Sequence, residues 1–208
     1  MKRILSPLPG VYALEPKVFG DSRGFFYEGY RADTFAALGI RAAFVQDNFS
    51  RSARGVLRGL HHQIGRPQAK LVRVLAGEIF DVAVDIRRGS PTFGRWAAVR
   101  LSGENKRALF VPAGYAHGFC VLSESADVIY KVTDLYAPAE ERGVIWDDPA
   151  LAIPWPLEGR PTLSAKDERY ATLAAQPEAD LPSYRPDPEA LAASPADLDR
   201  AVWTTGPA

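Results

Sequence analysis

The stretch GVLRGLHHQIGRPQAKLVR, residues 55–73, is the part of the sequence that decides both the fold and the site. It reads as two strand-like runs joined by a Gly-Arg-Pro turn. Side chains alternate between the two faces of a strand, so His61 and Gln63 share a face, and so do Lys70 and Val72. Polar groups at this density among apolar residues exceed what packing alone requires. The stretch therefore predicts a polar site inside a β-structure.

Arg58 does not fit this alternation, because it lies three residues before His61 and would face the other way in a regular strand. Gly59 stands between them, and a glycine inside a strand often marks a bulge. We expect an irregularity there to bring Arg58 and His61 into one cavity. The pattern alone is equally compatible with a solvated arginine at a sheet edge.

Short strand-like runs continue along the chain, separated by glycine and proline turn signals. The candidates are residues 43–50, 55–63, 69–75, 78–87, 96–101, 108–111, 117–122 and 127–135, after two earlier runs at 11–19 and 25–30. Many short strands at regular spacing indicate a sandwich or barrel. A glycine-rich G-x-G-x-x-G turn after a strand is absent, so the sequence does not indicate a dinucleotide fold.

The two ends of the chain carry other signals. Residues 11–19 contain Pro16 and predict an edge strand, and 31–38 predict a short helix. Ser164 predicts the cap of a second helix over 165–173. After residue 175 the composition changes to prolines, alanines and acidic residues. We therefore expect a domain over 1–175 and an extended or partly helical tail over 176–208, which Trp203 could anchor to the body.

Composition excludes several classes of protein. The 208 residues suffice for one domain with a substantial core. Lys plus Arg and Asp plus Glu both number 25, so net charge supports neither a nucleic-acid partner nor a membrane surface. The single cysteine, Cys120, rules out a disulfide within the chain. No apolar run suits a signal peptide or a membrane span, and a cytoplasmic location is expected.

Two adjacent histidines raise the possibility of a metal site. Residues 112–117, PAGYAH, match half of the motif by which many small barrels bind metal. However, His61 and His62 face opposite sides of their strand, and Gln68 and Lys70 stand where a carboxylate ligand would be needed. Such a set falls short of the three or four ligands that first-row metals prefer. We expect no metal and no cofactor.

A histidine without a metal can act as a general base near neutral pH. His61 would gain from a carboxylate that orients its ring. Asp167 can supply it only if the C-terminal segment returns to the barrel mouth, and otherwise it is a carboxylate at a helix start. Tyr130 lies on an apolar strand face, where it is either core or a proton donor.

Two amides on one face of a strand suit a polar ligand better than a core. Gln46 and Asn48 are placed in this way in the run FVQDNFS at 44–50. Arg23 and Glu28, in an aromatic segment near the N-terminus, read as surface charges when taken alone.

Several segments in order resemble the dTDP-4-dehydrorhamnose 3,5-epimerase family, a branch of the cupin-like barrels. The clearest are EPKVFGDSRGFFYE (15–28), GVLRGLHHQ (55–63) and LSGENKRALFVPAGYAHGFCVLS (101–123), and the likeness extends over 4–175. The resemblance implies a mainly β fold, a cupin-like double-stranded β-helix or jelly-roll barrel with a few short peripheral helices. His62 departs from it, because the family commonly has tyrosine there. This side chain is expected to point away from the site.

The resemblance also implies roles. His61 would be the base paired with Asp167, Tyr130 the proton donor, and Lys70 the cation beside the substrate's 4-keto oxygen. Tyr136 would stack on the thymine ring. Contacts with the sugar or its diphosphate are implied for Arg23, Glu28, Gln46, Asp47, Asn48, Arg58, His117, Glu141 and Lys166.

The implied reaction converts dTDP-4-dehydro-6-deoxy-D-glucose into dTDP-4-dehydro-L-rhamnose by epimerisation at C3 and C5 through an enolate. Two alternatives stay open from the residues. One is an epimerase that acts at C3 or C5 only, and the other is a non-catalytic barrel that binds a sugar nucleotide. The resemblance further implies a homodimer formed through the N-terminal strands.

Overall fold

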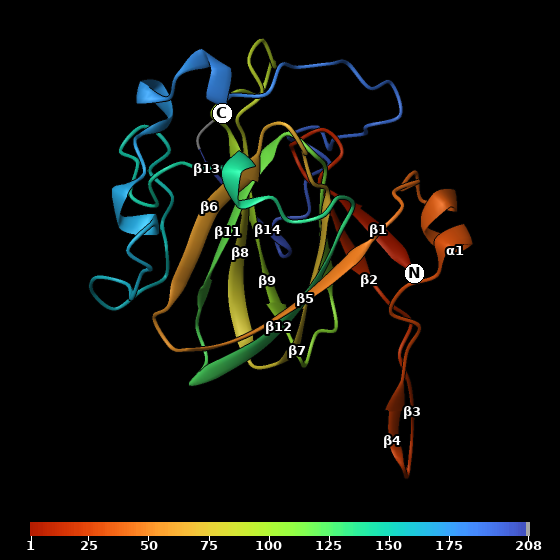
Figure 1. Cartoon of the computed structure of the whole chain (residues 1–208). Coiled ribbons are helices and arrows are strands. Elements are labelled where there is room, and N and C mark those ends of the chain that lie inside the picture. Colours follow the sequence, from red (N-terminus) through yellow and green to blue (C-terminus); the bar gives the residue numbers. More distant parts are fainter. Residues whose placement is uncertain (207–208) are drawn as a thin grey trace.

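Two six-stranded antiparallel sheets, packed face to face, form the body of the computed structural model, which describes residues 1–206 (Figure 1). The first sheet has the order β1-β2-β10-β7-β12-β5, and the second has the order β13-β6-β11-β8-β9-β14. Strands distant in sequence are neighbours in both sheets. The prediction of a mainly β barrel with few and short helices is confirmed.

Most strand bounds lie within a few residues of predicted runs, whereas the strands at 2–5, 19–21, 141–143 and 203–205 were not predicted as separate strands. The strands are β1 Lys2–Leu5, β2 Tyr12–Glu15, β3 Phe19–Asp21, β4 Gly24–Phe26, β5 Gln46–Ala53, β6 Leu57–Gln63, β7 Lys70–Ala76, β8 Glu78–Asp85, β9 Trp96–Ser102, β10 Ala108–Val111, β11 Tyr115–Val121, β12 Ser125–Val132, β13 Glu141–Gly143 and β14 Trp203–Thr205. Helix α1 spans Ala32–Ala37, close to the predicted 31–38.

The main core fills the space between the two sheets. Alternation along β7 sends Val72 and Val74 inward, and β8 faces them with Ile79 and Ala83. All four are buried. Further apolar layers cover the outer faces, with the segment after β13 lying over the second sheet and α1 packing beside β2 and β10. The interior is therefore apolar over much of its length, and a polar side chain inside it requires a specific explanation.

The N-terminal edge strand was predicted at the wrong place. Residues 2–5 form β1, which pairs with one side of β2, while β10 pairs with the other side. The segment 12–15 is thus an inner strand, and β1 occupies the edge. Pro16 follows directly after β2, so its missing N–H interrupts no ladder.

A two-stranded hairpin, β3–β4, projects from the body near this edge (Figure 1). Its aromatic side chains are largely in solvent: Phe25 is 59% exposed and Phe26 68%. Neighbouring apolar side chains exposed in this way are typical of interaction sites.

The helix predicted over 165–173 is also wrong. A 3₁₀ turn at Asp167–Arg169 is followed by extended backbone at Tyr170. Other groups replace the helical hydrogen bonds, because the Leu173 N–H donates to Asp148 Oδ2 at 2.6 Å. The predicted cap does form, with the Asp167 N–H donating to Ser164 Oγ at 3.1 Å.

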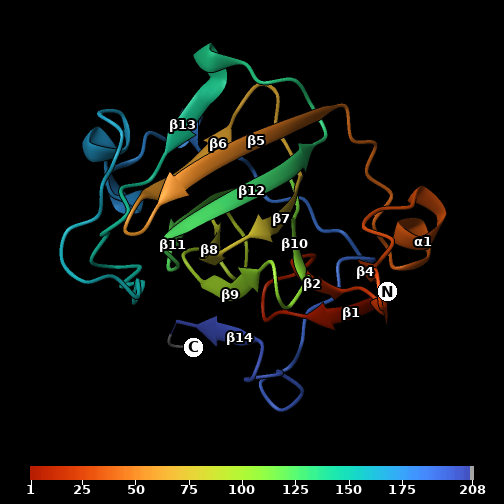
Figure 2. The same ribbon diagram turned by 90° about the horizontal axis from the view of Figure 1, so that it is seen from below.

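The C-terminal segment from 176 runs along the body rather than away from it (Figures 1 and 2). Its last part forms β14, which pairs with the edge of β9. Trp203 lies in this strand and is 4% exposed, so the expectation that it anchors the tail is confirmed. A division into a domain over 1–175 and a tail over 176–208 stays a prediction.

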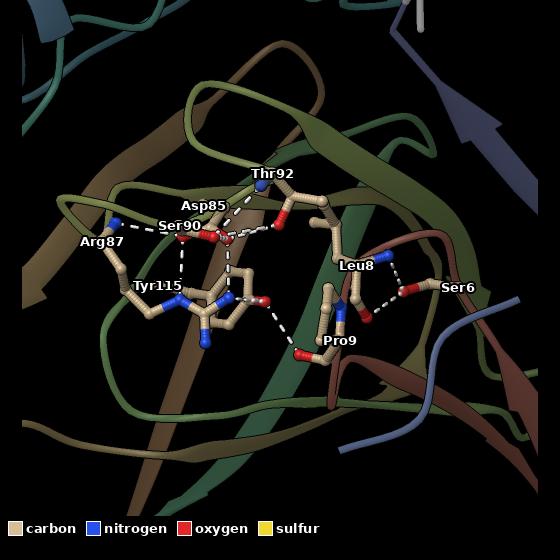
Figure 3. Close-up of polar contacts among 8 residues, drawn as sticks. All are labelled: Ser6, Leu8, Pro9, Asp85, Arg87, Ser90, Thr92 and Tyr115. Carbon is tan, nitrogen blue, oxygen red and sulfur yellow. Dashed lines mark hydrogen bonds and ion pairs between the residues drawn. The ribbon is translucent and has the colours of Figure 1, made fainter. Parts of the chain in front are cut away.

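A buried polar network lies at the end of β8 (Figure 3). The Arg87 guanidinium donates to both oxygens of Asp85, at 2.8 and 2.6 Å, and Ser90 and Thr92 hydroxyls donate to the same carboxylate at 2.6 Å. The Tyr115 hydroxyl accepts from Arg87 and donates to the Pro9 carbonyl at 2.8 Å. The network ties β8 and β11 to the N-terminal segment.

Candidate active site

A cavity of about 750 Å³ opens between the two sheets. Most of its polar lining was predicted from the sequence. Those predicted residues are Gln46, Asn48, Arg58, His61, Lys70, His117, Tyr130, Tyr136, Glu141, Lys166 and Asp167. They come from β5, β6, β7, β11, β12 and β13, from the loop after β12 and from the loop before residue 170. Closure of the barrel therefore assembles one site from segments far apart in the chain.

Arg58 reaches the cavity through a bulge in β6. His61 pairs with His117 while Arg58 pairs with Phe119, so β6 has one residue more than β11 over this interval. Gly59 makes the irregularity possible: a Cβ there would lie 2.5 Å from the Gly118 Cα. The predicted irregularity and the inward turn of Arg58 are confirmed.

The His61 ring is held by a carboxylate from the C-terminal segment. Its Nε2 lies 2.6 Å from Oδ1 of Asp167, which is 106 residues later and 2% exposed. Burial alone would raise the pKa of Asp167, but the hydrogen bond and charge of His61, with help from Ser164, bring it below its ordinary value. An ionised Asp167 accepts a hydrogen bond from the Nε2–H of His61. The ring proton therefore stays on Nε2, and Nδ1 keeps a free lone pair. The pair can therefore accept a proton.

Lys70 supplies a cation beside this pair. Its Nζ donates to the His61 carbonyl at 3.4 Å. Burial lowers the pKa of Lys70 to about 8, against the opposing charges of Glu141 and Asp81. The amine is thus mostly protonated at neutral pH and weakly partnered. A weakly solvated ammonium of this kind is suited to stabilise a developing oxyanion.

Tyr130 comes from β12, which pairs with β7 on the first sheet. Burial raises the pKa of its phenol, so the hydroxyl keeps its proton at neutral pH. His61 lies on β6 in the second sheet. The His61 imidazole and the Tyr130 phenol therefore lie on facing walls of the cavity.

A second histidine–carboxylate pair lies deeper. His117 Nε2 is 2.6 Å from Oδ1 of Asp81, and both side chains are buried. Burial lowers the pKa of His117, so the ring is neutral. Asp81 was missed by the sequence analysis. Its signal was present, because a carboxylate within the apolar run EIFDVAV is buried only when it has a partner.

Glu141 organises the rim of the cavity from β13. Its carboxylate pairs with the Lys166 ammonium and accepts from the Tyr170 hydroxyl at 3.2 Å. The Tyr170 ring meets the His61 ring edge to face, with 5.8 Å between centroids. Burial would raise the pKa of Glu141, but Lys166 and His61 hold it below its ordinary value. Tyr170 was not predicted as a site residue.

Tyr136 stands at the mouth and is half-exposed. Its backbone N–H donates to Gln46 Oε1 at 3.0 Å, and the next N–H, of Ala137, donates to Gln63 Oε1 at 2.9 Å. Two strand amides thus fix the loop that presents the aromatic ring. Gln46 has this positioning contact in addition to lining the cavity.

Three predicted contact residues lie away from the cavity. Arg23 and Glu28 belong to the projecting N-terminal segment, where they pair with Asp21 and Arg31. Asp47 faces the opposite side of β5 and pairs with Lys131 at 2.8 Å. The His62 ring bonds through Nε2 to the Asp180 carbonyl, away from His61, as predicted, although residue 62 also contributes to the lining of the cavity.

Within residues 1–206, no three His, Cys, Asp or Glu side chains gather closely enough to hold a metal ion. Over the same residues, no helix combines the length and apolarity needed to cross a membrane.

Fold and site together define a class: a cupin-like barrel whose interior is equipped for proton transfer. Residues 6–175 match the family model described as dTDP-4-dehydrorhamnose 3,5-epimerase. The chain belongs to the dTDP-4-dehydrorhamnose 3,5-epimerase family, as its sequence motifs predicted.

Individual relatives agree with this assignment. The dTDP-4-dehydrorhamnose 3,5-epimerase of Pseudomonas aeruginosa is 59% identical over 175 residues, which cover 84% of this chain and 97% of the relative. The dTDP-4-dehydrorhamnose 3-epimerase of Streptomyces niveus is 42% identical over 192 residues, or 91% of this chain and 92% of the relative. The crystal structure of a Legionella pneumophila 3,5-epimerase in complex with dTDP-4-keto-L-rhamnose superposes with a TM-score of 0.87 at 53% identity, covering 89% of this chain and 99% of that one.

Proposed function

We propose that this chain epimerises C3 and C5 of dTDP-4-dehydro-6-deoxy-D-glucose to give dTDP-4-dehydro-L-rhamnose. One observation carries the proposal: a carboxylate-held histidine, a buried ammonium and a protonated phenol share one cavity. Relatives at 59% and 56% identity have the 3,5-epimerase name.

The chemistry begins at a ketone that acidifies the hydrogens on both neighbouring carbons. His61 removes the C3 or C5 proton, and Asp167 stabilises the imidazolium that forms. The electron pair moves onto O4, where the Lys70 ammonium stabilises the enolate oxygen. Tyr130 returns a proton to the carbon from the opposite wall, which inverts the centre. Hydrogen moves as a proton in each step, so the carbon skeleton is neither oxidised nor reduced.

Recognition of the nucleotide is assigned to the mouth of the cavity. Arg58 offers a guanidinium that can contact the diphosphate through paired N–H groups. Tyr136 offers a half-exposed ring on which a thymine can stack. Gln46, Asn48, Glu141, Lys166 and His117 are proposed to contact the sugar or the diphosphate.

Proton NMR in deuterated water tests the proposal directly. Incubation of substrate with the enzyme should remove both the C3-H and the C5-H signals and yield the L-configured product. Exchange at one carbon only would contradict the double epimerisation. That outcome would favour the single-site activity of the relative from Streptomyces niveus, whose match also extends further along this chain.

We further propose that the active form is a homodimer. Arg23 and Glu28 lie on or next to the exposed β3–β4 hairpin, outside their own cavity (Figure 1). Exposed Phe25 and Phe26 on the hairpin, and Phe49 on β5 at 69% exposure, offer apolar surface for a second copy. In such a dimer the partner's Arg23 would reach the cavity, and its charge suits a diphosphate.

Subunit complementation tests this arrangement. Arg23→Ala and His61→Ala proteins are each expected to be nearly inactive. After subunit exchange, half of the dimers are mixed, and one of their two sites combines an intact His61 with the partner's intact Arg23. About a quarter of wild-type activity should return. No recovery in a sample shown by light scattering to be dimeric would mean that each chain uses its own Arg23.

A further inference from the structure

One residue of the C-terminal segment binds two neighbouring strands of the site at once. The Asp180 carbonyl bonds to His62 Nε2 at 2.8 Å, and its carboxylate accepts from Arg142 Nε at 2.7 Å. His62 and Arg142 are directly opposite each other in the β6–β13 ladder. Asp180 thus holds a cross-strand pair from the outer face, and it lies beyond residues 6–175, which match the family model.

The same two strands present site residues on the inner face. Alternation places His61 next to His62 along β6, and Glu141 next to Arg142 along β13. Both of these neighbours line the cavity. The contact made by Asp180 is therefore separated from the reacting groups by the thickness of one sheet.

Strand β13 is a short strand at the edge of its sheet. It is three residues long and pairs with β6 alone among the described strands, and this pairing continues at Val144, which exchanges backbone hydrogen bonds with Leu60. Outside this pairing, Gln176 Nε2 donates to the Gly143 carbonyl at 3.0 Å. Yet its Glu141 holds Lys166 and the Tyr170 hydroxyl, and Lys166 is the residue before Asp167. Through these contacts, a displacement of β13 would also move Asp167, the carboxylate that orients His61.

The His62 side of the contact is well determined. The ring is 4% exposed, and burial lowers its pKa to about 4, so it is neutral at physiological pH. Its Nδ1 has no partner within residues 1–206. The single ring N–H is therefore committed to the Asp180 carbonyl, because leaving that buried donor unpaired as well would cost stability.

We infer that Asp180 is a positioning residue for the active site: it fixes the β6–β13 pair from behind and thereby sets the geometry of the His61–Asp167 pair. It touches no reacting atom. The inference rests on the proposed function for its kinetic consequence only, because the position of the His61 ring can be measured without substrate.

Kinetics of two matched variants test the consequence. Asp180→Ala removes the bond to Arg142, and we expect kcat to fall about 10-fold with KM within about twofold, since proton transfer depends on alignment more than binding does. Glu178→Ala is the control. Glu178 lies in the same 3₁₀ turn, Glu178–Asp180, and its substitution removes an ion pair to Arg88 at 3.0 Å, which is more exposed than the pair of Asp180 with Arg142. Within residues 1–206 the Glu178 side chain makes no hydrogen bond or ion pair to β6 or β13. It should leave kcat and KM unchanged.

A conservative variant and a spectroscopic readout separate positioning from stability. Asp180→Asn keeps an acceptor for Arg142 and should recover most of kcat. The chain has three histidines, so the ring N–H spectrum is sparse. The His61 signal, identified by its loss in His61→Gln, should move in Asp180→Ala and stay in place in Glu178→Ala.

The outcomes are distinct. A lower kcat together with a moved His61 signal supports the inference. If Asp180→Ala matches Glu178→Ala in kcat or in the His61 signal, the inference is overturned, even when its melting temperature falls. A moved signal in a protein whose wild type shows no C3 or C5 exchange would instead count against the proposed function.

Discussion

Strand β8 contains two buried aspartates, four residues apart, whose surroundings differ. Asp85 accepts hydrogen bonds on both oxygens, from Arg87, Ser90 and Thr92 (Figure 3). Asp81 is equally buried, but its Oδ1 has one partner, a histidine ring, and its Oδ2 has none within residues 1–206. Both side chains point into the same barrel, on the same face of the strand.

The difference separates structure from chemistry. A buried carboxylate whose oxygens are all paired is held in one state, and its network joins strands. A half-paired carboxylate next to a cavity costs stability and persists where its field is useful, here on His117 and Lys70. The two aspartates differ in their hydrogen bonding and not in their burial.

The largest loss of activity is expected at the His61–Asp167 pair, the other histidine–carboxylate pair of the cavity. His61→Gln can still bond to Asp167 but cannot take a proton. Solvent exchange at C3 and C5 should fall about 10³-fold, the loss expected for a general base, while dTDP binding measured by calorimetry stays within a few-fold. Exchange at the wild-type rate would show that another group is the base.

Asp85→Asn tests the scaffold side of the comparison. Removing one charge of a buried ion pair strands the Arg87 cation, so the free energy of unfolding should fall by about 3 kcal/mol. Urea titration followed by tryptophan fluorescence measures it. Ser90→Ala, which removes one hydroxyl hydrogen bond to the same ionised carboxylate, should cost about 2 kcal/mol. The folded Asp85→Asn protein should keep normal kcat. A large loss of kcat would show that Asp85, like Asp81, supports activity.

Asp81→Asn should show the reverse pattern. The amide can still accept from His117, but the negative charge near Lys70 is lost. We expect activity to fall on the order of 10-fold, within the usual range for groups that support acid–base residues. The loss of stability should be smaller than for Asp85→Asn. A variant that is strongly destabilised yet fully active would show that Asp81 has a structural role only.

Lys70 resembles Asp81, because among residues 1–206 its only hydrogen-bond partner is the His61 carbonyl at 3.4 Å. Burial lowers its pKa to about 8, and the reaction needs the ammonium. Accordingly kcat/KM should decline as pH rises through about 8, as the cation is lost. In Lys70→Arg the cation persists to higher pH. This variant, although slower, should lack the decline between pH 7 and 9; an unchanged alkaline limb would assign it to another group.

Much of the site could be predicted from local patterns. Strand alternation grouped the inward residues, and Gly59 signalled the bulge that turns Arg58. Pairing across long distances could not be derived in the same way. The contact of Asp167 with His61 depends on how a segment 106 residues later returns to the barrel. The resemblance to the family supplied that pair, and spacing did not.

The errors have physical causes. The predicted helix over 165–173 had a correct cap, but Asp148 and other groups outside the segment bind its backbone, so tertiary contacts overrode local propensity. Residues 2–5 are too short a run to read as a strand alone, and β1 exists because β2 offers it a partner. Asp81 was not predicted, although a carboxylate in an apolar strand itself indicates a buried partner.

The pairing of β14 with β9 has a practical consequence for handling the protein. A truncated version ending at residue 175, where the match to the family model stops, would leave β9 as a bare sheet edge. Unpaired strand edges template association with other chains. Shortened versions should therefore precipitate or form larger aggregates during expression even when the catalytic cavity is intact, and the C-terminal strand acts as a safeguard of solubility.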